Sequence, residues 1–317
     1  MTDPERVLVV ALLVTFVAVY GSAAKIAVSA LRRRLRGQAA PRRSAVRRWA
    51  RRGVLALAAI GVGCMAYAYF VEPYWLEVTH VEIRSAKLPP GSDPVRIVHF
   101  SDTHCDPKVR LEESLPSTIA ELKPDVIVFT GDAINSRGGL GNFRRCMRRL
   151  AEIAPTYAVR GNWDVDYFGG VDLYGGTGVV ELADREKAID VKGLPLRLAG
   201  APVGHRWRAF EALPLAPDGP FTVLLYHYPG AIEEVSAGGA VDLQLSGHIH
   251  GGQIALPWYG AIITLARFGK RYEWGLYRVR GTWLYVNRGI GMEGGHVPRM
   301  RFFARPEVTV IDVRPDR

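Results

Sequence analysis

The sequence predicts an α/β sandwich with mixed β-sheets, preceded by two transmembrane helices. Two apolar runs near the N-terminus are each close to the length that crosses a bilayer as a helix. After residue 95, short β-rich runs first alternate with helical segments and then follow one another, which is typical of an α/β fold with mixed sheets. With 317 residues, 48% hydrophobic composition and three Cys, the chain is neither disordered nor a disulfide scaffold.

The two apolar runs cover residues 7–24 and 54–71, each without a charged side chain. Neither separates polar from apolar residues at the helical period, so we expect lipid on all sides of both helices rather than a protein core. This pattern predicts a first transmembrane segment within residues 1–30 and a second at 53–71. Aromatic residues mark the ends of the second segment: Trp49, Tyr67, Tyr69, Phe70, Tyr74 and Trp75.

The positive charge of the chain is concentrated between these runs. The chain has 41 Lys and Arg against 31 Asp and Glu, and residues 31–52 contain ten Arg and no acidic residue. The 29 basic and 29 acidic side chains after residue 52 balance, which disfavours nucleic acid as a partner and a nucleic-acid phosphodiesterase as the function. By the positive-inside rule, a short Arg-rich loop stays cytoplasmic, which predicts an inner-membrane protein with its C-terminal part outside the cytoplasm.

Two other interpretations of the arginines stay open. Arg47-Arg48 or Arg51-Arg52 could form a twin-arginine export signal, with cleavage near residues 66–68. That interpretation exports the same C-terminal part. The arginines could also bind anionic lipid headgroups, which is compatible with the two-helix topology.

Residues 72–94 are rich in Pro and predict a linker that contains at most one edge strand, at 78–83. The β-rich runs that follow lie at 95–100, 125–130, 156–159, 196–199, 221–226, 241–245, 276–279, 283–286 and 308–313. Helical patterns lie at 111–122 and 143–153. Cys105 and Cys146 are expected to be free thiols.

Several predicted strands end in polar clusters, at the position where open α/β sheets place their sites. These clusters are Ser101-Asp102-Thr103-His104, Gly131-Asp132, Gly161-Asn162-Trp163-Asp164, His227 and Ser246-Gly247-His248-Ile249-His250. Two Asp, four His and one Asn oxygen form a mixed donor set that suits Mn, Fe or Zn and lacks the thiolates of a structural zinc site. Seven ligands exceed what one tetrahedral ion with an open position can use, and they fit two ions that share a carboxylate.

The order and spacing of these clusters resemble the calcineurin-like metallophosphoesterase superfamily, whose signature is Asp-x-His, Gly-Asp, Gly-Asn-His-Asp/Glu, a lone His and Gly-His-x-His. The resemblance covers residues 95 to about 313 and implies a metallophosphoesterase domain at 95–317, with two mixed sheets flanked by helices. The tail at 251–254, with segments 267–269 and 287–291, looks like the membrane-anchored branch. That branch includes bacterial phosphodiesterases and enzymes that cleave UDP-diacylglucosamine in lipid A synthesis.

The resemblance implies two divalent ions, with manganese expected and iron, zinc or a mixture as alternatives. The first ion would be held by Asp102, His104 and His250. The second would be held by Asn162, His227 and His248, with Asp132 as the bridge between the two. The residues to which it implies catalytic roles are Asp132, Asn162, Asp164 and His250.

Trp163 departs from the family pattern, because the family usually has a His there that is assigned to protonating the leaving oxygen or orienting the phosphate. An indole N–H is not acidic at neutral pH and cannot act as a general acid. One hypothesis is a metal-binding membrane protein with little or no turnover. The other is a substrate whose leaving group needs no protonation, which favours a phosphodiester or pyrophosphate bond in a lipid- or nucleotide-linked molecule such as UDP-diacylglucosamine.

The candidate substrate contacts are Trp163 itself and Arg288, which follows a strand, while Asp164 could position substrate. His205 and His296 in loops are alternative proton donors, although a solvated loop histidine is the simpler interpretation. The apolar stretch 254–268 is too short to span a bilayer, and it predicts either ordinary core or a flap that receives an acyl chain or touches the membrane. The oligomeric state and the true substrate stay open. A cytoplasmic nucleotide-sugar substrate conflicts with the side of the membrane that the charge rule predicts.

Overall fold

The computed structural model describes residues 3–204, 218–294 and 299–316. The chain divides into two compact units, Met1–Val71 and Glu72–Arg317. Each unit has its own architecture, and the second contains all seven predicted metal ligands.

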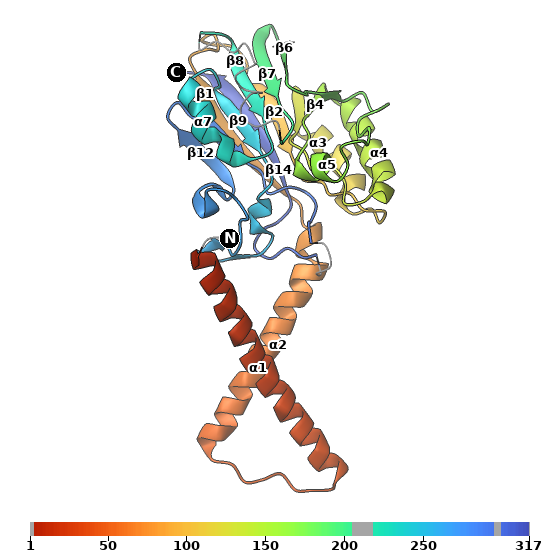
Figure 1. Ribbon diagram of the computed structural model, residues 1–317, viewed down its shortest axis with the longest axis vertical. Coiled ribbons are helices and arrows are strands. Elements are labelled where there is room, and N and C mark those ends of the chain that lie inside the picture. The colour runs from red at the N-terminus through yellow and green to blue at the C-terminus, as the bar shows by residue number, and fades with distance from the viewer. Residues whose placement is uncertain (1–2, 205–217, 295–298, 317) are drawn as a thin grey trace. The chain divides into compact units, whose positions relative to one another are not determined.

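The first unit is a pair of crossing helices (Figure 1), α1 (Asp3–Leu35) and α2 (Ala45–Phe70). The hydroxyl of Tyr20 on α1 donates to the carbonyl oxygen of Ala58 at 3.3 Å, and Gly61 on α2 leaves room for the Tyr20 ring. Small residues at a crossing let two apolar helices approach closely. Both helices are long and apolar enough to cross a membrane.

Both helices continue into the arginine-rich segment at 31–52. Arg32, Arg33 and Arg34 form the last turn of α1, and α2 begins at Ala45, so only residues 36–44 connect the helices. Arginine is a good helix former, and helices extend beyond the hydrocarbon thickness when their flanking residues favour helix.

The second unit contains two six-stranded sheets and a small hairpin. The first sheet has the strand order β1 (Glu77–Ser85), β14 (Glu307–Pro315), β2 (Val95–Phe100), β3 (Val126–Phe129), β4 (Thr156–Ala158) and β5 (Val180–Glu181). The second has the order β12 (Gly275–Val279), β13 (Thr282–Val286), β9 (Leu243–Ser246), β8 (Phe221–Leu225), β7 (Leu194–Gly200) and β6 (Arg185–Val191). The hairpin pairs β10 (Ala255–Leu256) with β11 (Gly260–Ala261).

Both large sheets are mixed. In the first, β2, β3, β4 and β5 are parallel, β14 pairs antiparallel with β2, and β1 pairs parallel with β14. In the second, β7, β8, β9 and β13 are parallel, whereas β6 and β12 are antiparallel edge strands. The central strands β3 and β8 are almost entirely apolar, as expected for strands that are covered on both faces of a sheet.

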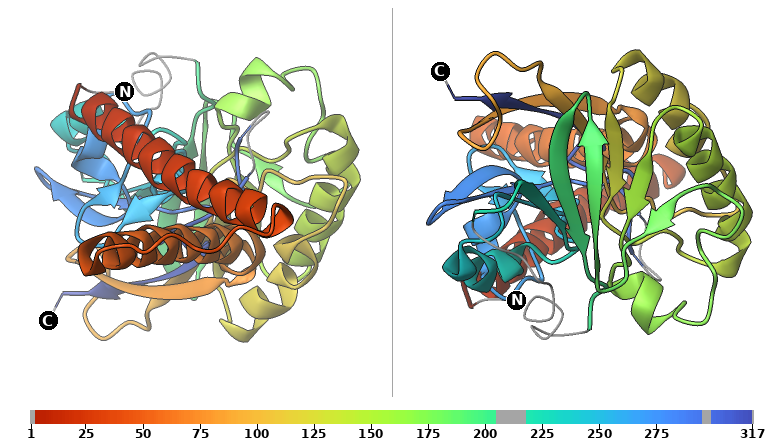
Figure 2. Two further views of the ribbon diagram at one scale, coloured as in Figure 1. Left: turned by 90° about the horizontal axis from the view of Figure 1, so that it is seen from below. Right: turned by 90° about the horizontal axis from the view of Figure 1, so that it is seen from above.

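The two sheets pack face to face, with helices outside them (Figures 1 and 2). The core between the sheets contains side chains from both, such as Ile97 and Val128 from the first and Val223 and Leu245 from the second. α3 (Leu115–Glu121) and α4 (Leu140–Ala151) cover the outer face of the first sheet. α7 (Ile232–Gly238) covers the outer face of the second, and α5 (Asn162–Asp166) follows β4.

The predicted α/β sandwich with mixed sheets is confirmed, and β1 lies at 77–85 within the segment expected to be a linker. The sequence analysis missed β6, because its charged side chains show no apolar alternation on this exposed edge strand. It also missed α7, which is only seven residues long. Cys105 and Cys146 are buried and free, as expected.

Candidate metal centre

The predicted ligands lie in loops that follow β2, β3, β4, β8 and β9. Within each sheet these strands are parallel, so their carboxyl ends meet at one edge. Hydrogen bonds join the edges of the two sheets, since Nδ1 of His227 lies 2.8 Å from the carbonyl oxygen of Thr130. The architecture therefore gathers side chains that are up to 148 positions apart in the chain, from Asp102 to His250.

Two groups of buried side chains have ligand atoms that all lie within 4.8 Å of one another. The first group is Asp102, His104 and His250, and the second is Asp102, Asp132 and His227. Asp102 therefore belongs to both groups. The carboxylate of Asp132 also reaches both, because it lies 3.6 Å from Nε2 of His104 and 3.2 Å from Nε2 of His227.

The other two predicted ligands lie beside the second group. Oδ1 of Asn162 is 3.1 Å from Nε2 of His227. The His248 ring lies 5.2 Å from the His227 ring, centroid to centroid, and the His248 backbone N–H donates to the Asp102 carboxylate at 3.1 Å. His248 is thus near the group, but its ring is not one of the atoms that converge within 4.8 Å.

Five of the seven predicted ligands have a left-handed backbone, which L-residues other than glycine rarely adopt. Their φ angles are Asp102 50°, His104 40°, Asp132 60°, His248 72° and His250 54°. Each such residue costs on the order of 1–3 kcal/mol and persists where the surrounding structure enforces it, most often at functional sites. The clustering of five such residues at this edge of the sheets agrees with a functional site there.

Close backbone approach explains one of the glycines in the motifs. A Cβ at Gly247 would overlap the Asp102 carboxylate and the Ser101 hydroxyl. Gly247 lets the His248 loop come directly over Asp102, so any larger residue there would push the two motifs apart.

Burial and mutual charge set the protonation of these groups. Burial lowers the pKa of His104 to about 4 and that of His248 to about 3, so both imidazoles are neutral and can offer a lone pair to a cation. Burial also opposes charge on His227, but the Asp132 and Asp102 carboxylates outweigh it and raise the pKa of His227 to about 9. A cation at this position would displace that proton.

The donor set fits divalent cations. Asp102 and Asp132 are fully buried, and neither forms an ion pair with Lys or Arg among the described residues. Although burial opposes their ionisation, nearby imidazoles hold the pKa of both carboxylic acids below the usual range. Burying two ionised carboxylates and several imidazole nitrogens together costs free energy unless cations lie between them.

Asp164, to which the resemblance implies a catalytic role, does not face the open part of the site. Its side chain is completely buried and accepts backbone N–H bonds from Asp132 at 2.8 Å, Ala133 at 2.8 Å and Gly161 at 3.0 Å. Burial and the neighbouring Asp132 carboxylate raise the pKa of Asp164 to about 7, and the three N–H bonds oppose this rise. Asp164 is a positioning residue that holds the Asp132 loop against the start of α5.

The Trp163 side chain lies beside the first group of ligands. Its indole meets the His104 ring edge-on, with centroids 5.3 Å apart, and also packs on Tyr167. Its backbone N–H donates to Oδ1 of Asp132 at 2.8 Å. The Trp163 side chain therefore packs against the predicted ligand His104, and it occupies the position at which the family has its His.

Arg288 is engaged elsewhere, which corrects its expected contact with phosphate. Its guanidinium pairs with Glu307 at 3.1 Å and with Glu77 at 2.9 Å, and only 12% of the side chain is exposed. The predicted donors His205 and His296 lie outside the described residues.

Sequence reasoning missed Arg301, which is fully buried beside the first group of ligands. Its guanidinium lies 3.5 Å from Nδ1 of His250 and donates to the carbonyl oxygens of Gly289 and Ala304 at 3.1 and 2.8 Å. Burial lowers its pKa to about 9. A lone Arg in a loop carries no sequence signal, so only the packing shows that it anchors the chain behind His250.

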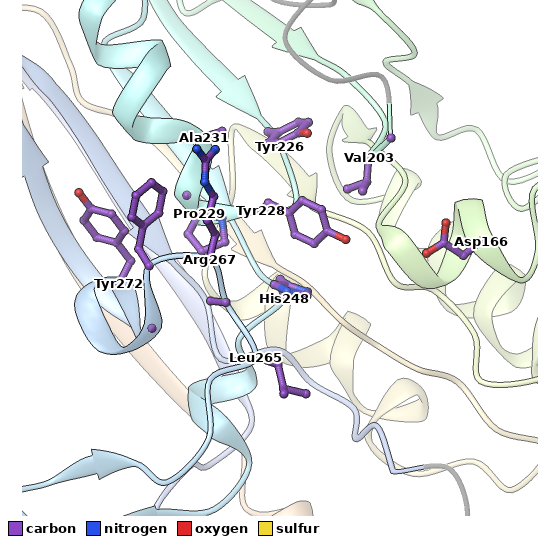
Figure 3. Close-up of a pocket in the computed structure, with 15 residues that line it drawn as sticks. Asp166, Val203, Tyr226, Tyr228, Pro229, Ala231, His248, Leu265, Arg267 and Tyr272 are labelled. Atoms are coloured by element: carbon purple, nitrogen blue, oxygen red, sulfur yellow. The ribbon is translucent and has the colours of Figure 1, made fainter. Parts of the chain in front are cut away.

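A cavity of about 760 Å³ opens beside His248 (Figure 3). Figure 3 shows Tyr228 between His248 and Asp166, with Leu265 on the other side of His248. The lining is mostly aromatic and aliphatic, and its charged members are Asp166 and Arg267. Such a pocket suits an apolar group attached to a polar reacting centre.

A buried Asp and His cluster at the carboxyl edge of two facing mixed sheets defines the class of metal-dependent hydrolases. Residues 95–252 match the family model for calcineurin-like phosphoesterase. The chain is 36% identical to the uncharacterized metallophosphoesterase YkuE of Bacillus subtilis (strain 168), over 83% of this chain and 94% of the relative. It belongs to the calcineurin-like phosphoesterase family.

Two further relatives are similar to most of this chain. The chain is 29% identical to phosphodiesterase YaeI of Escherichia coli (strain K12), over 78% of this chain and 92% of the relative. It is 30% identical to a transmembrane protein with metallophosphoesterase domain of Danio rerio, over 74% of this chain and 56% of that protein. The expected fold and the expected enzyme class, a metallophosphoesterase acting on a phosphorylated substrate, are confirmed.

Proposed function

We propose that this chain is a membrane-anchored phosphoesterase with two divalent ions, which hydrolyses a phosphodiester or pyrophosphate bond. The observation that carries the proposal is the pair of buried ligand groups that share Asp102. Asp102, His104 and His250 would hold the first ion. Asp132, with Asn162, His227 and His248, would hold the second, and Asp132 would also contact the first.

The chain's own residues prepare the site for a phosphoryl group. Ions held as a pair would supply a clamp for phosphoryl oxygens and an activated water. Asp164 and Gly247 bring the loops close enough for the ligands to converge, and Arg301 fixes the chain behind His250. Manganese is the metal that we propose, with iron, zinc or a mixture as alternatives that suit the same nitrogen and oxygen donors.

The bond type follows from Trp163. Since the indole cannot donate a proton to the departing oxygen, a leaving group that is stable as an anion is favoured. A phosphate or nucleotide meets this requirement and an alkoxide does not. The aromatic and aliphatic side chains that line the cavity beside His248 support a substrate with a lipid or aromatic portion, such as a lipid-linked pyrophosphate.

The proposal is tested with the full-length protein in detergent, loaded with Mn²⁺. We expect two ions per chain by mass spectrometry, and faster hydrolysis of bis-p-nitrophenyl phosphate than of p-nitrophenyl phosphate. Asp132→Asn should lose metal and turnover together, while Asp93→Asn, an exposed carboxylate elsewhere, serves as the matched control. One ion or none per chain would contradict the two-metal proposal, and equal rates on the two esters would contradict the preference for a diester over a monoester.

A second candidate is a metal-binding protein with little turnover, and Trp163 is the observation that favours it. That candidate predicts full metal occupancy without hydrolysis of either ester, and no difference in growth between cells with the wild type and cells with Asp132→Asn.

A further inference from the structure

Three segments of the second unit direct aromatic side chains into solvent. They carry Tyr74, Trp75, Trp258, Tyr259 and Phe303, which we call the aromatic face. Trp258 is completely exposed, and Trp75 and Phe303 expose 52% and 53% of their surfaces. Isolated exposed apolar residues are ordinary, but a group of large aromatic ones on neighbouring segments marks an interaction surface.

Hydrogen bonds hold the three segments side by side. The Ala255 N–H donates to the Phe302 carbonyl oxygen at 2.8 Å, which joins the β10–β11 hairpin to residues 302–305. The Ala304 N–H donates to the Glu72 carboxylate at 2.6 Å. The Arg305 guanidinium lies 4.2 Å from the centroid of the Trp75 ring and donates to the carbonyl oxygen of Trp75 at 3.1 Å. Residues 302–305 thus lie between the hairpin and the start of this unit.

The hairpin displays Trp258 outward on a fixed support. Trp258 lies in the turn between β10 and β11 with a φ of 62°, a strained conformation for this residue. Behind the turn, Glu273 accepts the Ala261 N–H at 2.7 Å, and Lys270 covers the Tyr259 ring at 4.2 Å. An exposed, strained and supported aromatic tip persists where it makes a contact outside the chain.

We propose that the aromatic face inserts into the interface of the lipid bilayer. The apolar helix α2 ends at Phe70, and Glu72, only two residues later, is bonded to Ala304 of the aromatic face's central segment. The second unit therefore begins at this surface, two residues after the apolar helix ends. Tryptophan and tyrosine prefer the headgroup region, where their rings are apolar and their polar atoms stay hydrated.

Charge plays a minor part in this contact. Among the described residues, the basic side chains at 267–271 and Arg305 already have acidic partners, in the pairs Arg267–Glu234, Lys270–Glu273, Arg271–Glu233 and Arg305–Glu77. Paired cations attract anionic headgroups weakly, and salt screens what remains. The contact should therefore form on zwitterionic lipid and persist at high salt.

The membrane contact also bears on the substrate of the proposed phosphoesterase. This consequence for the substrate rests on the proposed function. The hairpin starts five residues after His250, and the segment that follows it supplies Leu265, Arg267 and Phe268 to the cavity. A hairpin in the interface would place the cavity beside the headgroups. The favoured substrate is then a lipid-linked pyrophosphate or activated phosphodiester presented by the bilayer.

The proposal is tested by nitroxide labels on the full-length protein in phosphatidylcholine vesicles, with Cys64→Ala to remove the one cysteine that is not buried. Labels are attached to Trp258→Cys and Phe303→Cys. Val180→Cys is the matched control, because it is 43% exposed on β5, at the opposite edge of the first sheet from β1. Collisions with oxygen and with a water-soluble nickel chelate are measured by power saturation.

We expect oxygen to dominate at positions 258 and 303 and the nickel chelate at position 180, with the same result in 1 M salt. A label at 258 that meets the nickel chelate as readily as the label at 180 would overturn the proposal. So would a label at 258 that is shielded from both reagents, since it would then contact protein.

A second measurement separates this proposal from the proposed function. Hexadecyl p-nitrophenyl phosphate in the vesicles and bis-p-nitrophenyl phosphate in water release the same product. The double variant Trp258→Ser with Phe303→Ser should lose several-fold activity on the first and keep its activity on the second. Equal loss on both would overturn the consequence for substrate. If the wild type hydrolyses neither, the proposed function fails while the label depths still decide the membrane contact.

Discussion

At the residue scale, the candidate centre depends as much on residues that touch no metal as on the seven predicted ligands. Asp164 and Arg301 are both completely buried, and both bind backbone atoms of the ligand loops. Partners behind ligands orient them and tune their affinity. The ligand loops also store strain, because five ligands have positive φ. Substitutions behind the ligands should therefore disturb the centre strongly.

Asp164→Asn tests this positioning role. One of its two oxygens becomes an N–H₂ group that opposes a backbone N–H, so the Asp132 loop loses its anchor. We expect metal affinity and activity to fall about 10–100-fold. Metal titration and bis-p-nitrophenyl phosphate hydrolysis measure both. Partial rescue by excess Mn²⁺ is expected for a positioning residue, and an unchanged metal affinity would contradict this role.

Trp163→His tests the leaving-group argument. The substitution restores an imidazole beside His104, at the position from which the family's His acts. We expect activity on diesters with an alkyl leaving group to rise by up to about 10²-fold, because general acid catalysis is typically worth that much. Activity on p-nitrophenyl esters should change little. Trp163→Phe is the control, and equal gains with His and Phe would show that the effect is steric.

At the scale of elements, a buried group of ion pairs, which we call the ionic junction, connects strands of the first sheet to a loop of the site. Glu307 at the start of β14 pairs with Arg288 at 3.1 Å and accepts hydrogen bonds from the hydroxyls of Thr79 and Tyr285 at 2.7 and 2.6 Å. Arg288 also reaches Glu77 on β1. This junction connects β1, β14 and the loop that ends in Gly289, whose backbone packs against Asp102.

Glu307→Gln should destabilise the second unit by about 3 kcal/mol, because Arg288 loses its buried acidic partner and keeps only the partly exposed Glu77. Burial would raise the pKa of Glu307, but Arg288 outweighs it and holds the pKa below the ordinary value of 4.5. The stabilisation is therefore fully present above that value and declines as the pH falls toward the depressed pKa. Melting temperatures at several pH values measure this. The gap between wild type and variant should be wide at pH 7 and narrow in acid.

The matched control for this junction is Glu82→Gln on β1. Glu82 pairs with Arg84 on the surface, where an ion pair contributes little. An equal loss of stability in both variants would contradict the junction's role.

At the scale of the whole molecule, the arginines between the two helices predict which side of the membrane the second unit occupies. Ten Arg lie within residues 31–52, and the remainder of the chain after them is neutral. Such a connection resists translocation. We therefore propose that the connection is cytoplasmic and the second unit extracytoplasmic.

A reporter at the C-terminus tests this topology. Alkaline phosphatase fused after residue 317 should be active and a fluorescent protein there should be dark, because the first reporter folds only outside the cytoplasm. The control fusion after residue 40 keeps one helix and should show the reverse pattern. An inactive phosphatase at the C-terminus would place the site in the cytoplasm and restore UDP-diacylglucosamine as an accessible substrate.

The sequence by itself determined those features of this protein that depend on residues close together in the chain. Continuous apolar runs specify helices and buried strands, and the ligand types follow the strand ends in a fixed order. Polar edge strands such as β6 lack that signal. The ends of α1 and α2 lie within the arginine-rich segment, and the apolar runs alone did not predict them.

Only the tertiary structure decided what each polar side chain does. Asp164 binds backbone rather than substrate, Arg288 pairs with acids rather than phosphate, and Trp258 is exposed rather than buried. The partners of Arg288 are 19 and 211 positions away in the chain. Local pattern carries no information about such distant contacts, because they depend on how both sheets pack and on which buried charge needs a neighbour.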